Sequence, residues 1–169
     1  MRKSQTIALY GVLTALALVF GYIESVLPVF VFVPGMKLGL SNILVVFALY
    51  RLGDKSAMAI NLIRIVISSM LFGNVVSLIY SLAGGMLSTI VMIILKHINV
   101  FNIVTVSVVG GICHNVGQII AAAILMSTSA IMYYLAVLWI SGMVFGALIG
   151  LLAGVIVRRI PYKLTGGGL

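Results

Sequence analysis

The sequence predicts an all-α membrane protein, a single domain of about six transmembrane helices over residues 1–169. Two features of the composition support this prediction: 63% of the residues are hydrophobic and only 7% are charged. A water-soluble domain has about a quarter of its residues charged, so this chain has too few polar side chains to cover a soluble surface. The apolar residues also fall in runs of about 20, the length of helix that crosses a hydrocarbon core of about 30 Å.

Six apolar runs, separated by polar or Gly/Pro-containing breaks, define the expected helices. They are Thr6–Val26, Leu40–Leu52, Lys55–Phe72, Asn74–Leu95, Phe101–Met126 and Ala130–Val157. The second run is short for a span, so the Val33–Gly39 stretch is expected to enter the membrane region or to pack over its outer end. The Pro/Gly loop Leu27–Lys37 is therefore a candidate lid. The basic first residues and the apolar run after them imitate a signal peptide, but without a convincing cleavage site the first helix is expected to be retained.

The positions of Lys and Arg predict the orientation, because cytoplasmic loops retain positive charge. With the N terminus inside, the basic residues on the cytoplasmic side are Arg2, Lys3, Arg51, Lys55, Lys96, Arg158, Arg159 and Lys163. Lys37 falls in the first outer loop and Arg64 inside the third helix. We therefore expect a multi-pass protein of the cell membrane with both termini in the cytoplasm. The basic residues form no stripe with interleaved aromatic residues, so nucleic acid is not an expected partner.

Small residues recur at a spacing of four and predict close helix packing. The sixth helix carries Gly142, Gly146, Gly150 and Gly154, which leave a groove of bare backbone along one face. The first helix has a shorter version, Gly11-x-x-x-Ala15. One of these faces is a candidate for contact with another protein.

Arg64 is the most informative residue, because it lies near the middle of the third predicted helix. A charge at the bilayer centre costs at least about 2.5 to 3.5 kcal/mol, so such an arginine normally faces a partner or a water-filled cavity. Asn61 and Ser68 lie at helical spacing from Arg64 and share its face. We interpret this stripe as polar surface turned into the bundle. The structural alternative is that Arg64 only pairs with Glu24 or with backbone carbonyls.

Polar residues of four further segments are expected to join this stripe and to form a pocket open to the exterior. They are Glu24 of the first helix, Lys37, Ser41 and Asn42 around the first outer loop, the aligned Asn74, Ser77, Ser81, Gly84 and Ser88 of the fourth helix, and His114, Asn115 and Gln118 of the fifth. The charges predict a small anionic or zwitterionic ligand. For His114, a proton relay, a ligand contact and an interhelical hydrogen bond are all open, whereas a metal site is not expected.

The residue inventory disfavours catalysis. The sequence has no GxxxxGK[ST] phosphate loop, and its two acidic residues, Glu24 and Asp54, are far apart. The paired carboxylates that hold Mg²⁺ in diphosphate chemistry are therefore missing, and Asp54 is expected to cap the third helix. Cys113 is the single cysteine, so no disulfide forms within one chain. We expect no catalytic residue, no cofactor and no enzymatic activity.

Several motifs carry a resemblance to a known family. They are Pro34-Gly35-Met36-Lys37-Leu38-Gly39-Leu40-Ser41-Asn42, Arg51-Leu52-Gly53, the Asn61 to Gly73 segment with its Leu71-Phe72-Gly73 end, Ser81-Leu82-Ala83-Gly84-Gly85, and the His114-Asn115 pair. In them the chain resembles the Gx transporter family, which also has the name heptaprenyl diphosphate synthase component I. That family is similar to the S components of energy-coupling factor transporters, six-helix membrane proteins that capture vitamins and related micronutrients.

The resemblance implies a membrane transporter or substrate-binding subunit that takes a vitamin-like or anionic small molecule from outside. It implies that Lys37 and Ser41 belong to the loop that helps to close the site. It also implies that Gly11 and Ala15, which approximate the alanine motif of S components, dock onto an energy-coupling membrane subunit that works with ATPases. The alternative is a noncatalytic membrane component associated with heptaprenyl diphosphate synthase or with isoprenoid or quinone biosynthesis, and a third possibility is a scaffold with an empty pocket.

Overall fold

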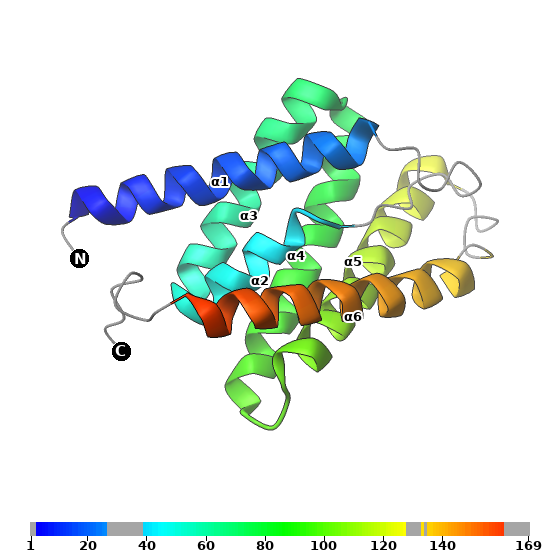
Figure 1. Ribbon diagram of the computed structural model, residues 1–169. Coiled ribbons are helices and arrows are strands. Elements are labelled where there is room, and N and C mark those ends of the chain that lie inside the picture. The colour runs from blue at the N-terminus through cyan, green and yellow to red at the C-terminus, as the bar shows by residue number, and fades with distance from the viewer. Residues whose placement is uncertain (1–2, 27–38, 128–132, 134, 161–169) are drawn as a thin grey trace.

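The structure is a computed structural model that describes residues 3–26, 39–127, 133 and 135–160. Within these ranges it contains six α-helices and no strand (Figure 1), which confirms the prediction of an all-α fold. The helices are α1 (Lys3–Val26), α2 (Asn42–Arg51), α3 (Asp54–Phe72), α4 (Val75–Ile98), α5 (Ile103–Met126) and α6 (Leu135–Arg159). The expected lid over residues 27–37, and the predicted start of the last helix at Ala130, lie outside the described residues.

Five of these helices, all except α2, are long and apolar enough to cross a membrane. The ten residues of α2 rise only about 15 Å at 1.5 Å per residue, half of a hydrocarbon core. The expectation that the second helix is short for a span is thus confirmed. Of the six expected spans, five correspond over the described ranges to helices that are long and apolar enough to cross a membrane.

The short helix α2 forms the centre of the core. Every residue from Ile43 to Leu49 is buried, as in a helix that is apolar all round and enclosed by its neighbours. The other buried residues of this core come from all five long helices: Leu13, Ala17, Ala57, Ile60, Met92, Val106, Ile149 and Ala153. The outer faces of the long helices instead expose large apolar side chains, such as Val12, Met70, Ile94, Ile124 and Leu151. Such a surface suits lipid as its solvent.

The glycines of α6 let it lie directly against the backbone of α5. A Cβ on Gly146 would stand 2.8 Å from the carbonyl oxygen of Ser107, and one on Gly150 would stand 2.7 Å from Cα of Val104. Gly142 meets the backbone of Gly111 in the same way, whereas a Cβ on Gly154 would meet nothing within 4 Å. The predicted close approach is confirmed for the first three glycines of the stripe, and it fixes the α5–α6 pair.

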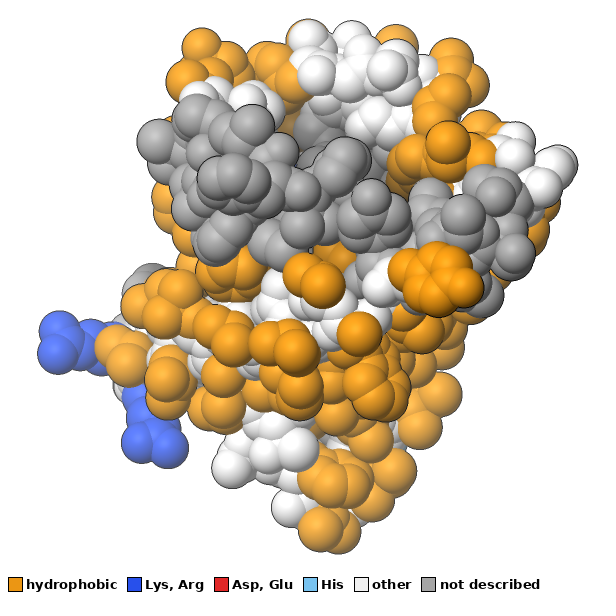
Figure 2. Space-filling model, turned by 90° about the vertical axis from the view of Figure 1, so that its right-hand side faces the viewer, with side chains coloured by type: hydrophobic (Ala, Val, Ile, Leu, Met, Phe, Trp, Pro, Cys, Tyr) orange, Lys and Arg blue, Asp and Glu red, His pale blue; other side chains and the backbone are white. Residues whose placement is uncertain are grey.

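The last turns of α2, α4 and α6 carry basic residues, and hydrogen bonds join α2 to both α4 and α6 there. Arg51, at the end of α2, donates through Nη2 to the carbonyls of Val157 and Ile160 at the end of α6. Lys96, in the last turn of α4, donates to the carbonyl of Leu49 near the end of α2 at 2.9 Å. We call this region, which contains Arg51, Lys96, His97, Arg158 and Arg159, the basic end. On the face drawn in Figure 2 the Lys and Arg side chains gather at one edge, and the other described side chains are mostly hydrophobic.

Candidate functional site

Arg64 of α3 is held by three neutral oxygens. Its Nη1 donates to Ser41 Oγ at 2.5 Å, and its Nη2 donates to Asn42 Oδ1 at 3.0 Å and to Asn61 Oδ1 at 2.5 Å. The guanidinium therefore links the middle of α3 to the start of α2. Because all three acceptors are neutral, these bonds do not neutralise its positive charge. Its Nε is buried and has no hydrogen-bond partner among the described residues.

Asn61 positions this guanidinium from behind. It is only 1% exposed, and its Nδ2 donates to the carbonyl of Gly85 at 3.0 Å and to Thr89 Oγ1 at 2.8 Å, both on α4. These two bonds orient the amide so that its oxygen accepts from Arg64. Linked hydrogen bonds among buried polar groups of this kind rigidify the side chains that they join. The structure thus places Asn61 next to Arg64 but outside the pocket lining described below.

A polar cavity of about 110 Å³ adjoins Arg64. It is large enough for several waters or for a small polar molecule, since one water needs about 10–15 Å³ on this measure. Its walls come from the last turn of α1, the start of α2, the second half of α3, the first turns of α4 and the middle of α5. The lining residues are Gly21, Glu24, Ser25, Gly39, Ser41, Asn42, Arg64, Ile65, Ser68, Ser69, Phe72, Gly73, Ser77, Ser81 and His114. We call this cavity the polar pocket.

The structure brings most, but not all, of the candidate site residues to the polar pocket. Those that line it are Glu24, Ser41, Asn42, Arg64, Ser68, Ser77, Ser81 and His114. Asn115 turns away, because its Nδ2 donates to the carbonyl of Leu138 at 2.6 Å and contacts Ser141 Oγ at 3.3 Å, both on α6. Gln118 packs with its Cγ against Gly84, where a Cβ would stand 2.8 Å away. Lys37 lies outside the described residues.

Seven of the lining residues were not among the site candidates predicted from the sequence: Gly21, Ser25, Gly39, Ile65, Ser69, Phe72 and Gly73. Phe72 extends the pocket-facing side of α3 by about one turn beyond Ser68, Ser69 lies next to Ser68, and Gly21 precedes Glu24 by one turn of α1. Phe72 follows Ser68 by four residues, so continuing the helical spacing from Arg64 would have found it. The sequence pattern did not identify Ser69, because this residue lies outside the helical spacing that joins Asn61, Arg64 and Ser68.

The last turn of α1 closes one side of the polar pocket. Tyr22 and Phe72 stack with ring centroids 5.1 Å apart and planes tilted by 46°, which joins the ends of α1 and α3. The carboxylate of Glu24 accepts a hydrogen bond from the backbone N–H of Gly39. Residues 39–42 are thus held by Glu24 on one side and by Arg64 on the other.

The charges around the polar pocket nearly balance. Among the described lining residues, the charged side chains are the permanent cation Arg64 and the carboxylate Glu24, with His114 as a third titratable group. Because they carry opposite charges and line the same pocket, Glu24 and the guanidinium attract one another. In a medium of low polarity this attraction, and that of either group for a ligand, is stronger than in water.

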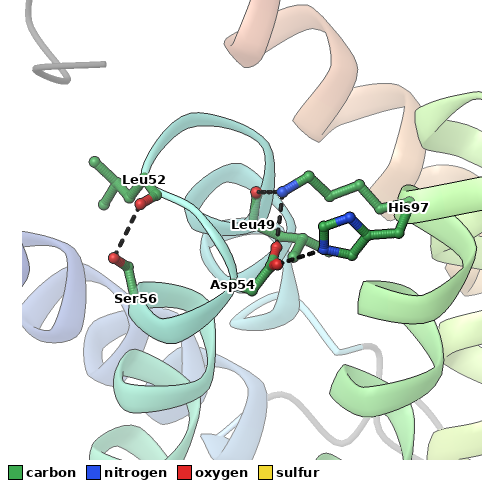
Figure 3. Close-up of polar contacts among 6 residues, drawn as sticks. Leu49, Leu52, Asp54, Ser56 and His97 are labelled. Carbon is green, nitrogen blue, oxygen red and sulfur yellow. Dashed lines mark hydrogen bonds and ion pairs between the residues drawn. The ribbon is translucent and has the colours of Figure 1, made fainter. Parts of the chain in front are cut away.

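The second carboxylate of the chain serves a different purpose at the basic end. Asp54 Oδ1 pairs with Lys96 Nζ at 2.8 Å and Oδ2 with His97 Nε2 at 2.6 Å (Figure 3). The prediction that Asp54 caps α3 is therefore wrong: Gly53, at φ 96°, is the N-cap, and Asp54 is the first helical residue with its side chain turned to α4. A glycine is suited to that left-handed backbone. Within the described ranges no three His, Cys, Asp or Glu residues gather as a metal site would require.

Comparison with known proteins places the chain in a family. The family model for heptaprenyl diphosphate synthase component I matches residues 13–156, a range that includes every residue lining the polar pocket. No curated protein and no solved structure matches the chain. Because the match spans most of the 169 residues, the chain belongs to the heptaprenyl diphosphate synthase component I family.

Proposed function

We propose that this protein is a membrane-embedded substrate-binding subunit of a transporter, which captures a vitamin-like, anionic or zwitterionic small molecule in the polar pocket. One observation carries the proposal. Arg64, within a helix long enough to span a membrane, points its guanidinium at neutral oxygens beside a polar cavity. An intramembrane arginine is expensive to maintain and typically marks a substrate or ion path.

The composition of the pocket wall supports binding rather than packing alone. Six serines and one asparagine line it in a chain whose residues are 63% hydrophobic. Small-molecule sites combine a concave surface with a few convergent polar groups, and these side chains provide both donors and acceptors. Structural glue would need Arg64 and its oxygens but not the additional hydroxyls of Ser68, Ser77 and Ser81.

We infer that the pocket takes its ligand from outside the cell and that both termini are cytoplasmic. The polar pocket is lined by the last turn of α1 and the first turns of α4, whereas Lys96, Arg158 and Arg159 lie at the opposite ends of their helices. Positive charge is retained on the cytoplasmic side of membrane proteins. A cytoplasmic basic end turns the pocket toward the exterior.

Transport then requires partners, which we propose to be an energy-coupling membrane subunit and its ATPases. The exposed face of α1 around Gly11 and Ala15 is the proposed contact, since a Cβ on Gly11 would meet nothing within 4 Å. We propose no catalytic role for the chain itself. Glu24 lies at the pocket and Asp54 is engaged at the basic end, so the two carboxylates do not form the pair that would hold Mg²⁺ for diphosphate chemistry.

The family description favours a second candidate, a noncatalytic membrane component of heptaprenyl diphosphate synthase. In that case the partner contact, and not the polar pocket, would carry the function. A long prenyl chain needs an apolar channel, whereas the large apolar side chains that line this pocket are Ile65 and Phe72. The two candidates therefore differ in both ligand and partner.

The test uses the full-length protein purified in detergent. Vitamins, flavins and isoprenoid diphosphates are screened by thermal shift, on the native protein and on two matched variants, Arg64→Met at the pocket and Arg159→Met at the basic end. We expect a ligand that stabilises the native protein and Arg159→Met but not Arg64→Met. Ser81→Val provides a second pocket variant that leaves the Arg64 bonds intact, and it is expected to weaken the response.

Co-purifying proteins separate the candidates further. Coupling and ATPase subunits support transport, and a soluble synthase subunit supports the second candidate. A ligand response that survives unchanged in both Arg64→Met and Ser81→Val would contradict binding in the polar pocket.

A further inference from the structure

We propose that the ligand of the polar pocket is a zwitterion, a small molecule that carries an acidic group and an ammonium group at the same time. This inference rests on the proposed binding function and narrows its ligand class. It starts from the two opposite charges that line the pocket, and it does not depend on where the ligand goes afterwards.

The acidic group of the ligand is assigned to Arg64. Three of the five N–H donors of this guanidinium are occupied by Ser41, Asn42 and Asn61, which fix its plane. The hydrogen bonds go to neutral oxygens, so the positive charge is oriented but not neutralised by them. An incoming carboxylate or phosphate would therefore meet a cation that is already held in place, which reduces the entropy lost on binding.

The ammonium group is assigned to the wall formed by α1 and the end of α3. Glu24 supplies a negative charge there, and the ring of Phe72 lines the same pocket while stacking on Tyr22. A carboxylate and an aromatic face both favour a cation, the first by Coulomb attraction and the second by its quadrupole. Glu24 acts on the ligand by its charge, so its bond to Gly39 is compatible with this role.

The geometry of α3 separates these two features. Arg64 and Phe72 are eight residues apart, which is about 12 Å along the helix axis at 1.5 Å per residue. The stretch between them presents the hydroxyls of Ser68 and Ser69 to the pocket. A molecule with charges at its two ends and a polar middle matches that order.

Electrostatics then ranks the ligand classes. A simple anion gains the attraction of Arg64 but is repelled by Glu24, and a simple cation has the opposite difficulty. A zwitterion gains from both, and it leaves the pocket with no net change of charge in a setting where unbalanced charge is costly. We therefore expect a zwitterion to bind about tenfold or more tightly than the same molecule without its ammonium group.

The experiment compares matched compounds on the purified full-length protein. A metabolite panel sorted into zwitterions, anions, cations and neutral molecules is screened by thermal shift, and it includes the triplet 4-aminobutyrate, butyrate and butylamine. For every zwitterion that stabilises the protein, the dissociation constants of that compound and of its deaminated acid are measured by calorimetry. The same ratio is measured for Glu24→Gln and, because the chain has one other acidic residue, for Asp54→Asn as the control.

The expected result is a set of hits concentrated among zwitterions, with a preference over the deaminated acid of about tenfold. Glu24→Gln should reduce that preference to about twofold or less, because it removes both the attraction for the ammonium group and the repulsion of the deaminated acid, and Asp54→Asn should leave it unchanged. Hits confined to anions or neutral molecules, or a preference that survives Glu24→Gln, would overturn this inference while the binding function stands. A panel without any hit would instead contradict the binding function itself.

Discussion

The two ends of this helical bundle use the same kinds of side chain in opposite ways. At the basic end, Asp54 pairs with Lys96 and His97, so opposite charges satisfy one another directly. At the polar pocket, Arg64 is bonded to neutral oxygens and lines the same cavity as Glu24. The first arrangement holds α3 against α4, whereas the second places a guanidinium among neutral oxygens beside a cavity. The neutral hydrogen-bond partners of Arg64 and the adjoining cavity thus distinguish the candidate binding site from the ion-paired basic end.

The sharpest test of the comparison replaces one arginine at each end. Arg64→Met should weaken ligand binding by about 30-fold or more, because loss of one partner of a desolvated charged contact costs about 2 to 5 kcal/mol. Arg159→Met, on the exposed last turn of α6, should change the dissociation constant by less than about twofold. Calorimetric titration with the ligand found by the screen measures both values. Equal effects from the two variants would remove the distinction between the ends.

A second test separates positioning from packing with two buried asparagines. Asn61→Leu removes an acceptor from Arg64 and two bonds to α4, so it should lower the free energy of unfolding by about 1 to 3 kcal/mol and weaken ligand binding by about tenfold. Asn115→Leu is the matched control, since Asn115 bonds to α6 and not to Arg64. It should cost a similar free energy of unfolding without changing the dissociation constant. Denaturant titration in detergent and calorimetry give the two quantities. Weaker ligand binding in Asn115→Leu would show that stability alone controls affinity.

These two asparagines also show what the sequence could and could not reveal about the site. The helices follow from apolar runs, because their length and hydrophobicity are local properties; α5, expected over Phe101–Met126, is observed over Ile103–Met126. Helical spacing likewise aligned Asn61 and Arg64. Local spacing does not decide whether His114 or Asn115 faces the pocket, because adjacent residues on a helix point about 100° apart. Which of them faces the pocket depends on the side against which α6 packs.

The bonds of Arg64 were equally beyond local patterns. Ser41 and Asn42 are 23 and 22 residues away in sequence, and only the packing of α2 against α3 brings them to the guanidinium. The alternative in which Arg64 pairs with Glu24 named a residue that lines the same pocket. How the Glu24 carboxylate is placed depends on where α1 ends and on the hydrogen bond that it accepts from Gly39, and neither follows from a local pattern. Asp54 was predicted to cap α3 because Asp favours that position. In the structure the N-cap is Gly53, with a left-handed backbone, and the Asp54 carboxylate forms an ion pair with Lys96.

The next test addresses the basic end. Asp54→Asn removes the charge that joins Lys96 and His97, and the pair with Lys96 is partly exposed, at 30% and 25% for the two side chains. Partly exposed ion pairs contribute about 0.2 to 1 kcal/mol each, so we expect a loss of about 1 kcal/mol in the free energy of unfolding and no change in ligand affinity. The loss should shrink when the titration is repeated at high salt, since salt screens exposed charges. Lys55→Gln, at the exposed neighbouring position, is the control and should have little effect.

The smallest expected effect comes from His97, and it measures how far the basic end depends on each partner of Asp54. The His97 side chain is 65% exposed, so water competes for its contact with Asp54, and the lysine partner remains when the histidine is replaced. His97→Gln should therefore lower the free energy of unfolding by about 0.5 kcal/mol or less. The double variant Asp54→Asn/His97→Gln should be no less stable than Asp54→Asn alone, because the histidine contributes through that carboxylate. If the effects of the two substitutions add instead, His97 stabilises the basic end through some other contact, and the pairing of opposite charges explains only the part of that end that contains Lys96.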